Sequence, residues 1–225
     1  GVANRTTVSY GGLQYIDGVS EGVANDTVVA GGGEQEVASG GTANRTTLNG
    51  GTQTVSSGGL ANVTTVNSGG VQDVRVGGVA SATQVNSGGT VTGTGTLVDA
   101  TIGAGGMLLA DQLGTGLTAQ NALTFGNGGV YRVVVDANRA AGLTQVVGNV
   151  TIGNGTSLSV VPQAGNYAAK TVYTVLTYTG SRSGTFTHLS SDFAYLTPTV
   201  LYPNGAVQLE LDRNDVRYGE VGSGT

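Results

Sequence analysis

Hydrophobic and polar residues follow one another in short runs along the first 90 residues, and pairs of glycines bound these runs. Residues 40–59, GGTANRTTLNGGTQTVSSGG, begin and end with such a pair and hold a third pair at the centre. The runs between the pairs are rich in Thr, Val and Leu, which favour strands, and no stretch has a sustained helical apolar stripe. The pattern therefore predicts short strands separated by sharp turns.

The runs repeat at a fixed spacing. Glycine pairs stand at 11–12, 32–33, 50–51, 69–70 and 88–89, and the last four recur at steps of 18 or 19 residues. The segments VANRTTV, VANDTVV, TANRTTL, LANVTTV and VASATQV precede the pairs, and LQYI, EQEV, TQTV, VQDV and a degenerate TVTG follow them. Such a period indicates stacked units, and it is too short for a propeller blade of four strands in about 40 residues. The sequence predicts an all-β fold, a single right-handed parallel β-helix with one coil per repeat.

Geometry explains the glycine pairs. A sharp corner often needs φ > 0, which glycine supplies without a Cβ penalty, and neighbouring coils stack only about 4.8 Å apart. A phosphate-binding loop would instead need a lysine at its end, opening a helix. The only lysine in the chain is Lys170, far from the repeats. We therefore interpret the glycines as corners of the solenoid.

Equivalent positions of successive coils form columns of like side chains. Alternation predicts that Val2, Asn4, Thr6 and Val8 face inward, although Ala3 is also small enough for a narrow interior. Asn and Gln repeated at the coil spacing can hydrogen-bond along the stack. The Asn and Thr columns also spell Asn-x-Thr, an N-glycosylation acceptor motif, but two ladders two residues apart produce it automatically. The three columns are Asn4, Asn25, Asn44 and Asn62 (then Ser81); Thr6, Thr27, Thr46, Thr64 and Thr83; and Gln14, Gln35, Gln53 and Gln72.

The period loosens towards the carboxyl end. Residues 1–90 form the regular repeats, residues 91–162 are expected to form longer, more apolar coils, and residues 163–213 a hydrophobic cap. An uncapped solenoid end exposes strand edges that invite aggregation, which such a cap would prevent.

Composition excludes several classes of function. The chain of 225 residues has 41 Gly, 3 Pro, no Cys and only 10% charged residues, with a net charge of −5. A nucleic-acid surface needs clustered Lys and Arg, and a disulfide framework needs cysteines. No run of 18 apolar residues is present, so no helix is expected to span a membrane.

Candidate chemistry is sparse. The one histidine, His188, lies near Ser190, Ser191 and Asp192, but no Gly-x-Ser-x-Gly elbow accompanies them. A structural or surface role is favoured for His188. The calcium-binding repeat Gly-Gly-x-Gly-x-Asp is absent, and Asp17, Asp26 and Asp73 fall in different columns. We expect no catalytic, cofactor or metal site.

A family resemblance enters at residues 173–215, YTVLTYTGSRSGTFTHLSSDFAYLTPTVLYPNGAVQLELDRND. This segment resembles the one that closes the passenger β-helix of type V autotransporters, and the glycine repeats resemble those of self-associating adhesins of the AIDA and antigen 43 type. The resemblance implies that residues 163–213 are an autochaperone-like region and that residues 214–225 begin a linker toward an outer-membrane β-barrel. It implies a bacterial cell surface or outer-membrane location, with release after cleavage as a further option.

The resemblance also implies a role in adhesion, autoaggregation or biofilm formation, through like passengers or a host-cell surface. A second hypothesis is a non-catalytic stem of an enzymatic passenger, a protease or esterase, whose active domain lies upstream. Passengers of this type are commonly O-glycosylated by heptosyltransferases, and if this chain follows them the turn serines Ser39, Ser57, Ser68 and Ser87 are the natural acceptors. Their corners are expected to carry a row of sugars along one edge of the solenoid. The alternative is that serine stands at these turns only because its local hydrogen bonds favour them.

Overall fold

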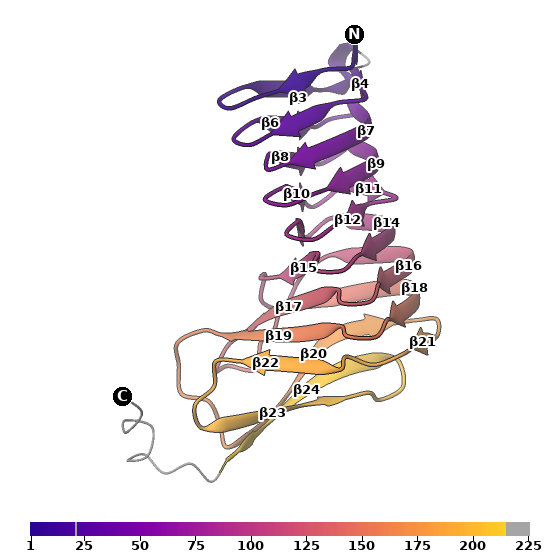
Figure 1. The fold of residues 1–225 in the computed structure, drawn as a ribbon. Coiled ribbons are helices and arrows are strands. Elements are labelled where there is room, and N and C mark those ends of the chain that lie inside the picture. The colour runs from indigo at the N-terminus through magenta and orange to yellow at the C-terminus, as the bar shows by residue number, and fades with distance from the viewer. Residues whose placement is uncertain (21, 215–225) are drawn as a thin grey trace.

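The protein is an elongated stack of β-coils that starts at the N-terminus and ends with the strands of the cap, β23 and β24 (Figure 1). The computed structural model describes residues 1–20 and 22–214, so most of the linker predicted at 214–225 lies outside the described residues. One short 3-10 helix, η1 (Gly18–Ser20), interrupts the strands of the described part near the N-terminus. No helix among these residues is long and apolar enough to cross a membrane.

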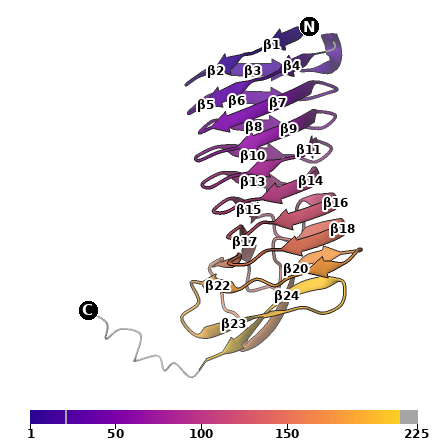
Figure 2. The ribbon, with the colours of Figure 1, turned by 45° about the vertical axis from the view of Figure 1, so that its right-hand side comes forward.

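Two sheets run along the stack, and strands of successive coils pair in parallel through most of it (Figure 2). In the described part the larger sheet has 15 strands and the smaller sheet has 9. The predicted parallel β-solenoid is therefore confirmed. The larger sheet contains β1 (Val2–Asn4), β2 (Thr7–Val8), β4 (Val23–Asn25), β5 (Val28–Ala30), β7 (Thr42–Asn49), β9 (Leu60–Val66), β11 (Val79–Ser81), β12 (Gln84–Val85), β14 (Thr96–Ile102), β16 (Thr118–Phe125), β18 (Thr144–Ile152), β20 (Lys170–Tyr178), β21 (Arg182–Ser183), β23 (Leu196–Leu201) and β24 (Ala206–Arg213). The smaller sheet contains β3 (Leu13–Ile16), β6 (Glu34–Val37), β8 (Thr52–Val55), β10 (Val71–Val74), β13 (Thr90–Gly93), β15 (Met107–Ala110), β17 (Val130–Val135), β19 (Ser157–Pro162) and β22 (His188–Ser191).

Each regular coil has three corners. Two are the glycine-pair turns, and the third lies inside the longer run, at a residue in the left-handed region that is not glycine. Arg45, for example, has φ 57° between Asn44 and Thr46 of β7. The same column of corners contains Arg5, Asp26, Arg45, Val63, Ala82, Asp99 and Asn121.

This third corner corrects the predicted interior. The left-handed residue adds one position to the alternation, so Ala43, Thr46 and Leu48 face inward while Asn44 is only half-buried. Val2 is 65% exposed and Asn4 is also exposed, contrary to the prediction. The Thr column and the apolar end of the run lie inside as predicted, but alanine occupies the interior position assigned to asparagine.

The carboxyl end changes its strand direction. β20 pairs with β24 and β24 with β23, both antiparallel, so the cap folds back across the last coils. Beside it, the rings of Phe125, Tyr131 and Phe186 lie with centroids 5.4 to 6.0 Å apart. This aromatic cluster fills the interior at the C-terminal half of the stack.

Candidate functional site

A ladder of buried glutamines runs through the interior of the N-terminal coils, as predicted. The amide nitrogen of each glutamine donates to the side-chain oxygen of the glutamine one coil earlier, at 2.7 Å for Gln35 to Gln14, Gln53 to Gln35 and Gln72 to Gln53. Gln35, Gln53 and Gln72 are at most 1% exposed. Parallel pairing in register places these side chains directly above one another.

A column of threonines faces this ladder across the interior. Thr46 Oγ1 donates to Gln35 Oε1 at 3.0 Å and Thr64 Oγ1 to Gln53 Oε1 at 3.1 Å. Thr27 and Thr83 make the same bond to Gln14 and Gln72. Each of these glutamine oxygens thus accepts from a threonine of the following coil, and three of the four also accept from the next glutamine. The ladder therefore satisfies buried polar groups in two directions, along the stack and across it.

The sequence showed both columns but not their coupling. A signal was available in the sequence, because the two columns end together, with Thr83 and Gln72 as their last members. In the structure, Thr83 donates to Gln72. Beyond them, Val91 and Leu108 continue the Gln column, and Ala100 and Leu123 continue the Thr column. The two polar columns of the interior thus become apolar at a single coil.

Asparagine ladders lie on the outside of the same coils. The amides of Asn25, Asn44 and Asn62 each donate to the asparagine one coil earlier, at 2.8 to 3.0 Å, so the predicted Asn ladder is confirmed although it does not face inward. A second ladder, Asn49, Asn67 and Asn86, precedes one of the glycine-pair corners, with bonds of 2.8 Å. Sequence reasoning missed it, although its asparagines recur at steps of 18 and 19 residues.

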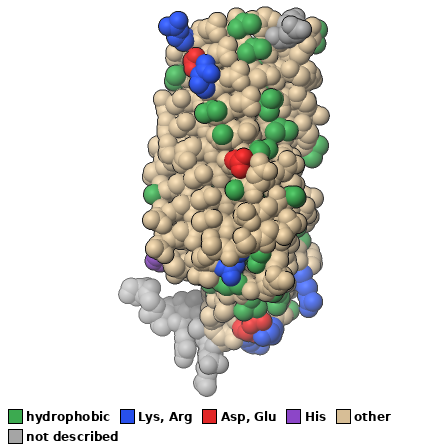
Figure 3. All heavy atoms as spheres, turned by 90° about the vertical axis from the view of Figure 1, so that its right-hand side faces the viewer, with side chains coloured by type: hydrophobic (Ala, Val, Ile, Leu, Met, Phe, Trp, Pro, Cys, Tyr) green, Lys and Arg blue, Asp and Glu red, His purple; other side chains and the backbone are tan. Residues whose placement is uncertain are grey.

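Charged side chains are few on the stack. Figure 3 shows a face made mainly of backbone atoms and of side chains that are neither charged nor hydrophobic. Arg45 makes a bidentate pair with Asp26, at 2.6 and 2.9 Å, between successive left-handed corners. This hydrogen bonding holds the pKa of Asp26 below its usual value and raises that of Arg45.

The four candidate acceptor serines are all exposed, but they do not form one row. Ser39 and Ser57 stand at the corner that follows the smaller sheet, where Ser39 N donates to Ser57 O at 3.0 Å. Ser68 and Ser87 stand at the corner that follows the larger sheet. The predicted single row is therefore wrong, because the two kinds of glycine-pair corner alternate along the chain and their serines stack on two separate edges.

Glycines of the next coil make room for three of these hydroxyl groups. A Cβ atom at Gly77 would lie 2.6 Å from Ser57 Oγ, one at Gly88 2.8 Å from Ser68 Oγ, and one at Gly105 2.7 Å from Ser87 Oγ. All three glycines also have φ near +70°. Glycine is therefore needed at these positions for two reasons: the backbone is left-handed, and a Cβ atom would collide with the serine side chain of the preceding coil.

His188 lies on β22, exposed, with its Nδ1 3.2 Å from the hydroxyl of the adjacent Thr187. It pairs in register with Ser157 of β19, so its neighbours are strand residues of the stack. In the described part of the chain, no group of three or more His, Cys, Asp or Glu side chains could hold a metal ion.

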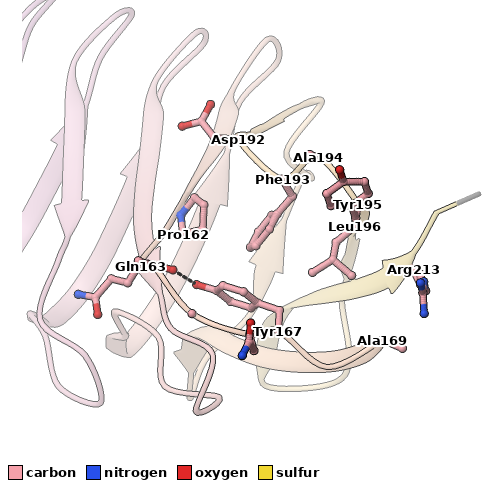
Figure 4. A pocket seen from close by; sticks show the side chains of 13 residues that line it. Pro162, Gln163, Tyr167, Ala169, Asp192, Phe193, Ala194, Tyr195, Leu196 and Arg213 are labelled. Atoms are coloured by element: carbon pink, nitrogen blue, oxygen red, sulfur yellow. Dashed lines mark hydrogen bonds between the residues drawn. The ribbon is translucent and has the colours of Figure 1, made fainter. Parts of the chain in front are cut away.

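A cavity of about 760 Å³ opens at the C-terminal end, between the loop after β19 and the loop after β22 (Figure 4). Tyr167 and Phe193 meet there edge to face, with ring centroids 5.0 Å apart. The Tyr167 hydroxyl reaches two backbone carbonyls, of Val135 and Gln163, at 2.9 and 2.8 Å. Burial raises the pKa of this phenol above its usual value. The two hydrogen bonds and the contact with Phe193 hold the ring in the cap.

Comparisons with known proteins address the repeats. Residues 48–89 match the family AIDA, described as "Adhesin of bacterial autotransporter system, probable stalk". Among solved structures, one similar chain is described as "Crystal structure of TibC-catalyzed hyper-glycosylated TibA55-350 fragment". It shares 25% sequence identity over 86% of this chain and 83% of that chain, with a TM-score of 0.38. A search of curated proteins gives no significant match.

The matched segment covers the coils that hold Gln53, Gln72, Thr64 and Thr83, where the interior ladder is complete. The resemblance expected from the glycine repeats is thus confirmed on the coils that carry it. Residues 48–89 are therefore similar to the probable stalk repeat of bacterial autotransporter adhesins.

Proposed function

We propose that this chain is a stiff, non-catalytic part of a bacterial surface adhesin that promotes autoaggregation, biofilm formation or attachment to host cells. The observation that carries the proposal is the match of residues 48–89 to an adhesin stalk, on coils whose interior is a continuous hydrogen-bonded ladder. Such an interior ties each coil to its neighbours, which favours a rod over a chain of loosely joined units.

The outer faces support self-association. They carry short uncharged side chains in register, such as Thr47 and Thr65 on adjacent strands β7 and β9. Two such faces can approach without the like-charge repulsion that keeps proteins apart. A charged pair placed there should prevent the approach without disturbing the buried side of the strand.

A settling assay tests this role. Cells that display the chain are expected to settle from suspension faster than cells that display Thr47→Glu/Thr65→Glu, with Thr47→Ser/Thr65→Ser as the matched control. Equal display is checked by labelling the surface. If wild-type display leaves settling unchanged, the adhesive role falls and a stem for an upstream catalytic domain becomes the better assignment.

We also propose that a heptosyltransferase O-glycosylates Ser39, Ser57, Ser68 and Ser87. All four are exposed at corners, and the glycine that follows one coil later leaves space around three of the hydroxyl groups. Intact mass spectrometry after co-expression with such an enzyme should show added sugar, reduced in Ser57→Ala but not in Ser56→Ala, since Ser56 is only half-exposed. An unmodified mass with an active enzyme would contradict this proposal.

The C-terminal region, residues 163–213, is proposed to act as the folding nucleus of the passenger. Its antiparallel strands bury large apolar side chains such as Tyr173, Leu176 and Leu209, whereas the glutamine coils bury mainly alanine and valine. In a stack stabilised by nearest-neighbour contacts, the most stable unit can template the others.

A further inference from the structure

The cavity of about 760 Å³ in the cap has the size of a small-molecule site, about 300–1,000 Å³. Hydrogen bonds fix the segments around it. Arg213 N donates to Ala169 O at 2.8 Å, and Asn214 N donates to Tyr195 O at 3.0 Å. The Tyr167 hydroxyl ties the loop after β19 to the backbone of the last coils. The cavity is therefore formed before any ligand arrives.

Aromatic rings provide much of its apolar lining. Tyr167, Phe193 and Tyr195 all line the cavity, which is three of the 12 aromatic residues of the chain (9 Tyr and 3 Phe). Tyr167 and Phe193 are half-buried, so each ring keeps part of its surface towards solvent. Leu196 is buried and connects this lining to the hydrophobic core. The cavity thus offers an apolar surface on which the C–H face of a ring-shaped ligand can pack.

Polar side chains of the same lining have no partner. Four of them make no hydrogen bond or ion pair with the described residues: Gln163, Asn166, Asp192 and Arg213. Elsewhere on the cap, Lys170 makes ion pairs with Glu210 and Asp212 at 3.1 and 3.3 Å. The cap thus pairs charges on its strands, while the two charges at the cavity remain available to a ligand.

These two charges stand at different ends of the cavity. Leu209 and Leu211 are the buried positions of an alternating pattern along β24, and Arg213 falls in the same phase. Its side chain therefore leaves the strand on the side of the core, at the point where the core ends. In Figure 4 Asp192 lies on the opposite side of the lining, beyond Phe193. A ligand that covers the rings meets a cation at one end and a carboxylate at the other.

This combination selects among small ligands. A fatty chain would cover four polar side chains without pairing them, which is costly. A nucleotide brings several negative charges, and Arg213 is the one cation among the described lining residues. A pyranose ring with a carboxylate suits every part of the lining. Its C–H face packs on the rings, its carboxylate accepts two bonds from a guanidinium, and its hydroxyl groups bond to Asp192 and the amides.

We propose that this cavity binds a pyranose sugar that carries a carboxylate, as hexuronic acids do. Arg213 holds the carboxylate, and Tyr167 and Phe193 pack against the sugar ring. The site is on the cap, away from Thr47 and Thr65 of β7 and β9. The settling assay and the sugar site can therefore fail independently of one another.

An NMR titration of the full chain with glucuronic acid tests the proposal. Glucose and acetate serve as probes that separate the sugar ring from the carboxylate. The backbone amide signals of Asn166, Phe193 and Ala194 should shift with glucuronic acid at a Kd on the order of 1 mM. Glucose and acetate should each bind on the order of tenfold more weakly, since each lacks one of the two contacts. Arg213→Gln should weaken glucuronic acid by that factor and leave glucose unchanged.

Three further variants make the result specific. Arg132→Gln is the matched control, because Arg132 of β17 is exposed and also makes no ion pair with the described residues. Arg213→Lys keeps the charge without the forked guanidinium, so it should retain only part of the affinity. Phe193→Leu should weaken both sugars but not acetate, in a chain whose other amide signals stay in place. The proposal is overturned by unshifted cavity signals, by equal affinity for glucuronic acid and acetate, or by equal losses in Arg132→Gln and Arg213→Gln.

Discussion

Replacing Gln53 by leucine should destabilise the N-terminal coils, although the change places an apolar residue in a buried position. Gln53 is 0% exposed and takes part in three hydrogen bonds: it donates to Gln35 and accepts from Gln72 and Thr64. Leucine is close to glutamine in size, so the change leaves little cavity. The loss is therefore mainly one of hydrogen bonding.

The magnitude follows from the donors that are left behind. Gln72 Nε2 and Thr64 Oγ1 both lose their acceptor inside the stack, at about 1–3 kcal/mol for each buried unsatisfied group. The threonine hydroxyl can recover part of its loss by rotating towards a nearby backbone carbonyl. Burial of leucine returns about 1.5–3 kcal/mol. We expect a net loss of about 1–3 kcal/mol.

The assay must resolve single coils, because stacked repeats can open separately and one global midpoint can hide a local change. Native-state amide exchange of β8 and β10 reports the opening free energy of the coils that hold Gln53 and Gln72. Gln84→Leu is the matched control: Gln84 is half-buried, and its amide makes only a 3.3 Å bond, to Asn86. Its change should stay within about 0.5 kcal/mol.

A double variant separates hydrogen bonding from packing. Gln53→Leu/Gln72→Leu removes the orphaned amide that the first change creates. The double variant should therefore lose less stability than the sum of the losses of the two single variants. If Gln53→Leu leaves the opening free energy of β8 unchanged or raises it, the ladder only fills space, and the reasoning is refuted.

Three further outcomes follow from the structure. Val63→Asn should stabilise the chain by about 1 kcal/mol, because Val63 is a β-branched residue at φ 57° and asparagine tolerates this region; urea unfolding checks it, with the exposed corner residue Val76→Asn as a control. Limited proteolysis should leave a C-terminal fragment that begins between about residues 95 and 125, because the coils with the apolar interior are expected to be the more stable part. Preservation of residues 1–90 instead would contradict this expectation. Burial raises the pKa of Tyr173 to about 12. The free energy of unfolding should therefore fall as pH rises from about 10, where unfolded phenols ionise, towards 12. Tyr173→Phe should reduce that fall without abolishing it, because burial also raises the pKa of Tyr131.

The repeat period was enough to predict the solenoid, since the coil is the smallest unit that can bury these strands and glycine pairs mark its corners. It was not enough to predict which side chains enter the interior. Arg45 and its column adopt a left-handed conformation that sequence patterns assign to glycine or asparagine, and this bend shifts the alternation by one residue. The asparagines were therefore placed inside, where alanine lies.

The prediction that the serines form a single row was wrong for a related reason. The motifs ASGG, SSGG and NSGG are nearly identical, yet Ser57 follows a strand of the smaller sheet and Ser68 follows a strand of the larger one. Only the pairing of the strands distinguishes the two kinds of corner. The sequence did not show the antiparallel direction of the cap strands either. An apolar strand such as β24 can pair in either direction, and its hydrophobic pattern is the same in both.

The change of interior at Val91 divides the stack into two parts whose coils make different demands on their neighbours. A glutamine coil satisfies its donors only with an acceptor one coil earlier, so each such coil demands another before it. An apolar coil makes no such demand, because Leu108 and Leu158 pack on any neighbour of similar size. The ladder can therefore propagate from the apolar half towards the N-terminus but cannot end without leaving a buried donor, as Gln14 does. Each further coil would satisfy one such donor and leave its own, so this bond gives the stack a direction but does not set its length.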